Sequence, residues 1–222
     1  MLPDIINLST LQTRAQQRFD EQGWPPAKSE AWKYTSLDAL ASDAPRPAND
    51  ISGSANLPDN FSWPHCRIVL HGGIFRSDLC DELPSGVKLL AVGDDSRALT
   101  TLDELGATGS LVSSLSVAQM TAGISLSIEP GAFIDKPLIF HFVGGVKNAA
   151  SYPVIYIEIG DEAEVAIAEH HETNSGFSAP FVVARVGASA RFDHVKLQLE
   201  SVETKHLGLT CFTLAERADV NS

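Results

Sequence analysis

Basic residues are scarce in this chain of 222 residues. It has 16 Lys and Arg against 28 Asp and Glu, which gives a formal net charge of -12 at pH 7. A surface of this sign repels phosphate groups, so nucleic acids and anionic membranes are disfavoured as partners. Hydrophobic residues make up 44% of the chain, so the composition indicates a folded domain with a buried core rather than a disordered segment.

Cysteine is also rare, and no two cysteines form a Cys-x-x-Cys pair. The three are Cys66, Cys80 and Cys211. This pattern excludes the motifs of zinc ribbons and ferredoxin-type clusters, and it indicates reduced thiols in a cytoplasmic protein. Cys211 falls in a predicted strand and is interpreted as a small buried residue. Nothing around Cys66 or Cys80 indicates a nucleophile with a lowered pKa.

Signals for export and for common enzymatic reactions are missing too. No apolar run approaches the roughly 18 residues of a transmembrane helix, and the first residues lack the basic segment of a secretory signal. The chain contains neither a Gly-x-x-x-x-Gly-Lys phosphate loop nor a Gly-x-Ser-x-Gly elbow. We therefore expect a cytoplasmic protein with no membrane or nucleic-acid partner, which does not hydrolyse ATP through a phosphate loop and has no nucleophile elbow.

The first forty residues have a helical pattern. Apolar residues recur every three or four positions over 4–22, which predicts an amphipathic helix. Gly23 suits the end of this helix, and two prolines then prevent its continuation. Short helices are predicted over 29–34 and 36–40, each with a serine at its start as the N-cap.

A repeat of about 28 residues follows Gly123. The segments "IEPGAFIDKPL", "IEIGDEAEVAI", "ARVGASARFDH" and "FTLAERADVNS" begin at Ile128, Ile157, Ala184 and Phe212, at offsets of 29, 27 and 28 residues. The first three share a glycine that marks a corner, and a small or apolar residue follows it three positions later. The register is imperfect, because Lys136 falls where the next two copies carry Val165 and Phe192.

Such a repeat predicts a mainly β fold built from stacked coils. Alternation within the second copy places Ile155, Ile157 and Ile159 on one face of a strand. We expect a right-handed parallel β-helix (β-solenoid) core preceded by a small N-terminal α-helical region. A two-sheet sandwich with hairpins is the alternative. The fourth copy stops at Ser222 in mid-coil, so we expect a piece of a longer protein or an open end that meets a partner, such as a second copy in a homodimer.

The pattern divides the chain into four parts. They are an N-terminal helical region at 1–42, a linker at 43–64, a mixed α/β lead-in at 65–112, and β-helix coils, truncated at the C-terminus, at 113–222. Within the lead-in, "CRIVLHGGIF" predicts a hairpin with its turn at Gly72–Gly73. A strand is predicted over 86–92, a helical or irregular stretch over 94–105, and a helix over 113–123.

The segment "EHHE" at 169–172 has the composition of a metal-binding group. Neighbours on a regular strand point to opposite faces, so His170 and His171 cannot both bind one ion. We therefore expect a solvated coil edge here. His194 aligns with Ile167 in the repeat, which favours a core histidine with satisfied hydrogen bonds over a ligand.

One acidic corner, "GDEAEV", contains Asp161, Glu162 and Glu164. Paired carboxylates could serve a polysaccharide-cleaving β-helix. The group occurs in one copy only, however, so its charges are interpreted as surface solvation. The sequence therefore predicts no catalytic, cofactor-binding or metal-binding residue.

Three stretches together resemble the SufD proteins of the SufB/SufD family, which belong to the SUF machinery of iron–sulfur cluster assembly. "AKSEAWKYTSLDAL" resembles the family's N-terminal signature, although Ala27–Lys28 replaces the usual Arg-Lys. "LSVAQMTAGISLSIEPGAFIDKPLIF" resembles the entry into its core. "IEIGDEAEVAIAEHHE", "GASARFDHVKLQLES" and "KHLG" resemble the coils that follow. The resemblance covers most of residues 5–222.

The resemblance implies a non-catalytic subunit that works with a SufB-like subunit and a SufC-like ATPase in scaffold assembly and iron acquisition. The family's interfaces would lie beyond Ser222, so no interface residue is carried over. An iron–sulfur cluster or iron is expected only in the full complex, with none bound by this fragment. Trp32 and Tyr34 are expected to anchor the N-terminal helices to the core. The alternatives are a SufB-like scaffold subunit and a β-helix carbohydrate-active enzyme.

Overall fold

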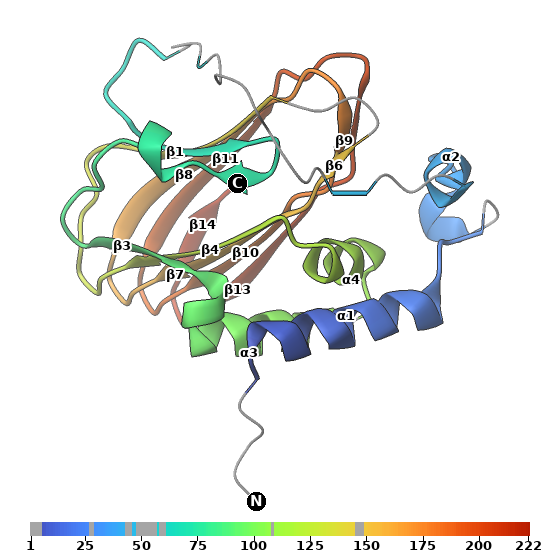
Figure 1. The fold of residues 1–222 in the computed structure, drawn as a ribbon. Coiled ribbons are helices and arrows are strands. Elements are labelled where there is room, and N and C mark those ends of the chain that lie inside the picture. The colour runs from blue at the N-terminus through green and yellow to red at the C-terminus, as the bar shows by residue number, and fades with distance from the viewer. Residues whose placement is uncertain are drawn as a thin grey trace, which may run out of the picture.

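The computed structural model describes residues 6–26, 29–42, 46–47, 57, 61–107, 109–144 and 149–222. Most of the predicted linker at 43–64 lies outside the described residues. Helices gather at one side of a stack of strands, as Figure 1 shows. None of the helices in these ranges is long and apolar enough to cross a membrane.

The N-terminal helical region forms close to the predicted positions. Its elements are α1 (Leu8–Gln22), the 3-10 turn η1 (Glu30–Trp32) and α2 (Asp38–Ser42). Helix α1 begins later than predicted because the side chain of Asn7 accepts a hydrogen bond from the Thr10 N–H at 2.9 Å and so acts as the N-cap. It ends as predicted at Gly23, whose φ of 64° is left-handed and whose N–H donates to Phe19.

The lead-in contains the predicted hairpin, strand and helix. Its elements are β1 (Cys66–His71), β2 (Ile74–Phe75), η2 (Ser77–Leu79), β3 (Val87–Ala91), η3 (Val92–Asp94), α3 (Ser96–Gly106) and α4 (Leu111–Ala118). Strands β1 and β2 pair antiparallel around Gly72–Gly73, so the predicted hairpin is confirmed. The predicted end of the helix at Gly123 is wrong: α4 stops at Ala118, because Ala122 and Gly123 already pair with the strand of the next coil.

The remaining strands form the solenoid. They are β4 (Ala122–Ile128), β5 (Leu138–Val143), β6 (Ala150–Ser151), β7 (Pro153–Ile159), β8 (Glu164–Glu172), β9 (Gly176–Ser178), β10 (Phe181–Val186), β11 (Arg191–Gln198), β12 (Thr204–His206), β13 (Leu209–Leu214) and β14 (Asp219–Asn221).

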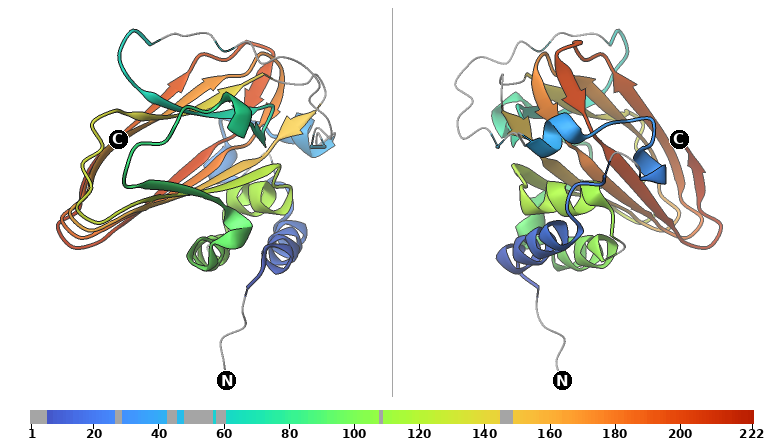
Figure 2. Two further views of the ribbon diagram at one scale, coloured as in Figure 1. Left: turned by 60° about the vertical axis from the view of Figure 1, so that its left-hand side comes forward. Right: turned by 90° about the vertical axis from the view of Figure 1, so that its right-hand side faces the viewer.

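Together with β1, β2 and β3, these strands form three stacked sheets, and Figure 2 shows the stack from two sides. The described strands run in the order β14-β11-β8-β5-β1-β2 on one face, β13-β10-β7-β4-β3 on the second and β12-β9-β6 on the third. Each pairing within β4–β14 joins one coil to the next and is parallel. The structure therefore confirms a mainly β fold with a parallel β-solenoid of about three turns, and the hairpin sandwich is wrong.

The register explains why the repeat looked imperfect at Lys136. Ile128 pairs with Ile159, but Leu138 pairs with Ile167, so the corner of the first coil is two residues longer than that of the second. Lys136 lies exposed in this longer corner rather than on the inner face. A two-residue insertion leaves strand alternation unchanged, because side chains repeat with a period of two.

The corners of successive coils share a backbone conformation that the sequence pattern did not reveal. Glu162, Ser189 and Arg217 have φ values of 60°, 57° and 59° at equivalent positions. At Gly160 the coils approach so closely that an added Cβ would lie 2.5 Å from the backbone nitrogen of Pro130. The glycine therefore permits close stacking rather than a left-handed turn.

Apolar side chains pack on both sides of the second face. Inside the solenoid, Ile155 and Ile157 of β7 belong to the central core. On the outside, Tyr156 and Phe181 pack against α1 through Leu11. The helices thus cover the outer face of this sheet, as Figure 2 shows.

Ion pairs join two of these helices to each other. Arg14 and Arg18 of α1 bind the Asp103 carboxylate of α3 at 2.6 and 2.7 Å.

Of the two aromatic residues expected to anchor the N-terminal helices, Trp32 packs against the core and Tyr34 does not. Trp32 is half-buried and packs with Phe19 and Trp24 against a core that includes Leu37 and Tyr152. The expectation for Tyr34 is wrong, because its side chain is 92% exposed. The turn after η1 directs Tyr34 to solvent, and Trp24 supplies the second anchor.

Replacing these two aromatic residues should therefore have unequal effects. We expect Trp32→Ala to lower the free energy of unfolding by about 1–2 kcal/mol, since a half-buried ring loses part of its apolar contacts. Tyr34→Ala should change it by less than about 0.5 kcal/mol. Urea unfolding of both variants measures the difference, and equal losses would contradict the assignment of Trp32 as the anchor.

Candidate functional site

A band of histidines and carboxylates crosses the sheet formed by β5, β8 and β11. In the parallel register His141 lies opposite His170, and Phe142 lies opposite His171. Alternation along β8 continues the inward face of Val165 and Ile167 to Glu169 and His171, while His170 and Glu172 face outward. Strand β8 therefore contributes polar side chains to both faces of the sheet.

The expectation of a solvated edge at 169–172 is wrong. Glu169, His170 and His171 are fully buried, because β8 has β5 on one side and β11 on the other. The Phe61 ring covers the outer side, with its centroid 4.9 Å from that of His170. The argument that adjacent histidines point to opposite faces nevertheless holds, since His170 and His171 join different groups.

Glu169 is the centre of an ionic network inside the solenoid. Its carboxylate lies 3.1 Å from His171 Nε2, 3.0 Å from His194 Nε2 and 3.1 Å from Lys196 Nζ, and it accepts a hydrogen bond from Thr210. Burial acts to raise the pKa of Glu169, but hydrogen bonds from the two histidines and the charge of Lys196 outweigh it and hold the pKa far below its usual range. Glu169 is therefore ionised.

His194 confirms the sequence interpretation of a satisfied core histidine. Its side chain is 4% exposed, and Nδ1 lies 2.9 Å from the Ser222 hydroxyl while Nε2 contacts Glu169. Both ring nitrogens thus have protein partners.

His171, Glu200 and His206 form a second group, here called the inner triad. One possible ligand atom from each lies within 4.8 Å of the others. His206 Nδ1 lies 2.9 Å from Glu200 Oε2, and the Thr173 hydroxyl donates to the same carboxylate. His171 reaches the triad from the preceding coil, with its ring edge-on to that of His206 at 4.8 Å.

His141, His170 and Glu172 form a third group, here called the outer triad. Its possible ligand atoms also lie within 4.8 Å of one another. His141 Nε2 lies 2.7 Å from Glu172 Oε2, and His170 Nε2 lies 3.8 Å from Glu172 Oε1. The two imidazole rings stack with centroids 4.7 Å apart and an interplanar angle of 15°. Both rings are buried, while the Glu172 side chain is 16% exposed.

Burial lowers the pKa of both histidines of the outer triad. At His141 the Glu172 carboxylate acts to raise the pKa, but burial, His170 and Arg67 outweigh it. At His170 burial also outweighs the attraction of Glu172. Both rings are therefore neutral at pH 7, which leaves each with one nitrogen lone pair.

The other residues singled out in the sequence stay outside these groups. Asp161 and Glu162 lie exposed at a corner, where Asp161 accepts the Ala188 N–H. Burial raises the pKa of all three thiols, that of Cys66 to about 11, so none of them is an activated nucleophile.

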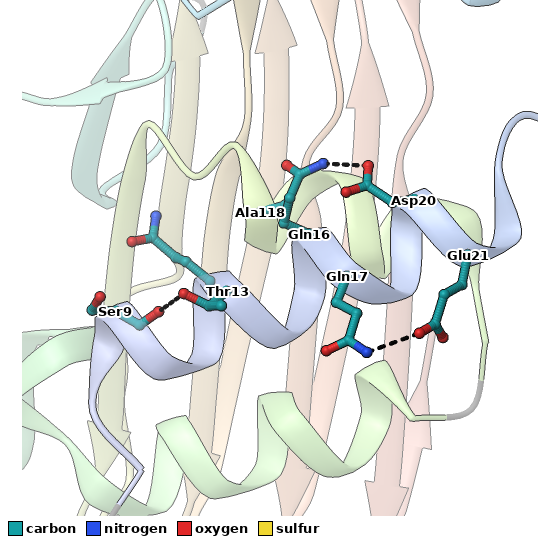
Figure 3. Close-up of a pocket in the computed structure, with 8 residues that line it drawn as sticks. Ser9, Thr13, Gln16, Gln17, Asp20, Glu21 and Ala118 are labelled. Carbon is teal, nitrogen blue, oxygen red and sulfur yellow. Dashed lines mark hydrogen bonds between the residues drawn. The ribbon is translucent and has the colours of Figure 1, made fainter.

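A hollow along the exposed side of α1 has no comparable chemistry. Figure 3 shows that its polar side chains pair within the helix. Gln16 donates to Asp20, Gln17 donates to Glu21, and Thr13 donates to the Ser9 carbonyl. The buried histidines on the sheet are thus the stronger candidate site.

The sequence contained a usable signal for the outer triad. His141 precedes His170 by 29 residues, which is the offset of the first two copies, so stacking the copies places these rings side by side. Glu200 and His206 could not be found in this way. His206 lies on β12, in the short face that the repeat alignment did not predict, and Glu200 lies in the loop between β11 and β12.

Comparison with known protein families finds a match within the coils. Residues 141–222, from β5 to the last described strand, match the family "SUF system FeS cluster assembly, SufBD core domain".

A curated relative is an iron–sulfur cluster assembly protein. The chain is 27% identical over 217 residues to the iron-sulfur cluster assembly protein SufD of Escherichia coli (strain K12), a match that covers 92% of this chain and 50% of that protein. The chain thus spans about half the length of this relative. The two matches confirm the resemblance to SufD that the sequence motifs indicated.

We expect two glutamates of β8 to contribute unequally to the free energy of unfolding, because only one of them belongs to the buried network. Glu169→Ala leaves His171, His194 and Lys196 without their carboxylate, and we expect it to lower the free energy of unfolding by about 3–5 kcal/mol. Glu164 is the control, because its side chain is 47% exposed and contacts Arg191 at 3.5 Å, so Glu164→Ala should cost less than about 1 kcal/mol. Urea unfolding at pH 7 distinguishes them, and similar losses would argue against the network.

We expect the contribution of Glu200 to the free energy of unfolding to depend on pH. Burial acts to raise its pKa, but hydrogen bonds from His206 and Thr173 outweigh it and lower the pKa to about 2. Because the unfolded state binds the proton first, the stabilisation by Glu200 is present above pH about 4.5 and is lost as the pH falls toward about 2. The loss of unfolding free energy caused by Glu200→Gln should therefore be larger at pH 7 than at pH 3, and a pH-independent loss would contradict the assignment.

Proposed function

We propose that this chain is a non-catalytic subunit of the SUF machinery of iron–sulfur cluster assembly. In this proposal it acts in the cytosol with a SufB-like subunit and a SufC-like ATPase, and it supports scaffold assembly and iron acquisition. The observation that carries the proposal is the SufBD core match, which falls on the stacked coils at 141–222. The similarity to SufD extends beyond these coils, to 92% of the chain.

The alternative of a carbohydrate-active enzyme lacks support from the acidic corner. Glycosidases place two carboxyl groups on opposite sides of the bond that they cleave. Here Asp161 accepts a backbone N–H and Glu164 contacts Arg191, and this arrangement is that of coil-to-coil contacts. The SufB-like alternative is less favoured, because the matching relative is SufD.

Affinity capture of the full-length gene product from the cytosol of its own organism tests the proposal. We expect a SufC-like ATPase and a SufB-like protein to co-purify, with capture from a strain that carries the untagged protein as the control. Deletion of the gene should lower the activity of iron–sulfur enzymes such as aconitase, and the intact gene should restore it. A protein captured without these partners, together with normal enzyme activity in the deletion strain, would overturn the proposal.

A further inference from the structure

We propose that the outer triad binds a divalent first-row transition metal ion, with His141, His170 and Glu172 as its protein ligands. This site goes beyond the proposed function and does not depend on it, because the argument uses only the geometry and chemistry of these three side chains. It also revises the prediction from sequence that the chain has no metal-binding residue.

The ligand set has a defined chemical preference. Two imidazoles and one carboxylate with open positions suit Fe²⁺, and the same set binds Zn²⁺ in several enzymes. Mg²⁺ and Ca²⁺ prefer oxygen ligands and a larger number of them. The three ligands here therefore select for a transition metal.

The parallel sheet brings the ligands together without any irregular backbone. His141 and His170 are direct partners in the register of β5 and β8, and Glu172 follows His170 on the same face of β8. The Glu172 carboxylate contacts both rings, since Oε2 lies 2.7 Å from His141 and Oε1 lies 3.8 Å from His170. Ligand atoms around a tetrahedral ion with bonds of about 2.0–2.2 Å lie roughly 3.3–3.6 Å apart. Because an imidazole binds a metal ion in its own ring plane, at least one of the two stacked rings has to turn about its χ2 angle for both nitrogens to reach one ion.

His170 is the observation that points most directly to a ligand. It is fully buried, and neither ring nitrogen has a hydrogen-bond partner among the described residues. A buried polar atom without a hydrogen bond destabilises the fold. A metal ion at the triad would bind one of these nitrogens and offset this cost. It would also replace the proton that His141 and Glu172 share across 2.7 Å.

The inner triad is the weaker candidate for the same ion. Its carboxylate, Glu200, already has His206 at 2.9 Å and the Thr173 hydroxyl as partners. The His171 Nε2–H also donates to the Glu169 carboxylate at 3.1 Å. A metal ion there would have to displace these contacts, whereas in the outer triad both ring nitrogens of His170 lack a hydrogen bond among the described residues.

The surroundings of the outer triad favour binding of a cation from one side. The Phe61 ring covers His170 and shields it from water. The Glu172 side chain is 16% exposed, so an ion can reach the triad from solvent on that side. The chain's net charge of -12 attracts cations, although Arg67 acts on His141 with the opposite sign.

Titration of the chelator-treated full chain with Co²⁺ tests the site, since the visible absorption of Co²⁺ reports its ligands and calorimetry reports stoichiometry. We expect binding of Co²⁺ and Zn²⁺, weaker binding of Fe²⁺ measured directly under anaerobic conditions, and no comparable binding of Mg²⁺. His141→Gln and Glu172→Gln should each weaken Co²⁺ binding at least about tenfold, because even residues that only orient a ligand cost 10–100-fold.

The matched controls are His206→Gln, which alters the inner triad, and His65→Gln, which removes a nearby histidine outside both triads. Both should bind Co²⁺ like the unaltered chain. Circular dichroism and urea unfolding verify that each variant folds, and Glu172→Gln, the most exposed position, keeps the test informative if His141→Gln unfolds. Absence of Co²⁺ binding, unchanged binding by folded Glu172→Gln, or loss of binding in His206→Gln would each overturn the proposal.

Discussion

Parallel backbone pairing between successive coils is the constraint on which the rest of this structure depends. A single coil has neither a complete set of backbone hydrogen bonds nor a closed apolar core, and both arise when the next coil stacks on it. The stacking fixes which side chains meet. Ile157 of one coil meets Leu126 and Ala184 of its neighbours in the core, and His141 meets His170 by the same rule.

The same stacking makes the polar band on β8 costly unless its members are paired. Glu169 continues an inward row of apolar residues, and its charge is tolerated because two histidines, a lysine and a threonine surround it. His170 lies on the opposite face without an equivalent set of partners among the described residues. Glu169 thus belongs to a network that stabilises the fold, whereas the unpaired nitrogens of His170 suit it to bind a ligand.

Particular residues show how far the sequence could be interpreted. The repeat and the strand alternation predicted the stacked coils, because both depend on local periodicity. Tyr34 was misassigned because exposure depends on the direction of the chain after η1, and Trp24 provides the contact instead. The buried state of 169–172 was missed because a charged run has no local signal of burial; β5, β11 and Phe61 provide it from elsewhere in the chain.

The sequence by itself determined the class of fold, the corners, the hairpin at Gly72–Gly73 and the resemblance to SufD, since each is written in short-range spacing or in a motif. Only the tertiary structure decided the two-residue extension of the first corner, the helices' contact with the outer face of β7 and β10, and the two triads. The physical reason is that register between coils is a property of pairing, not of any one segment. A shift of the coils would separate His141 from His170 while leaving every local pattern intact.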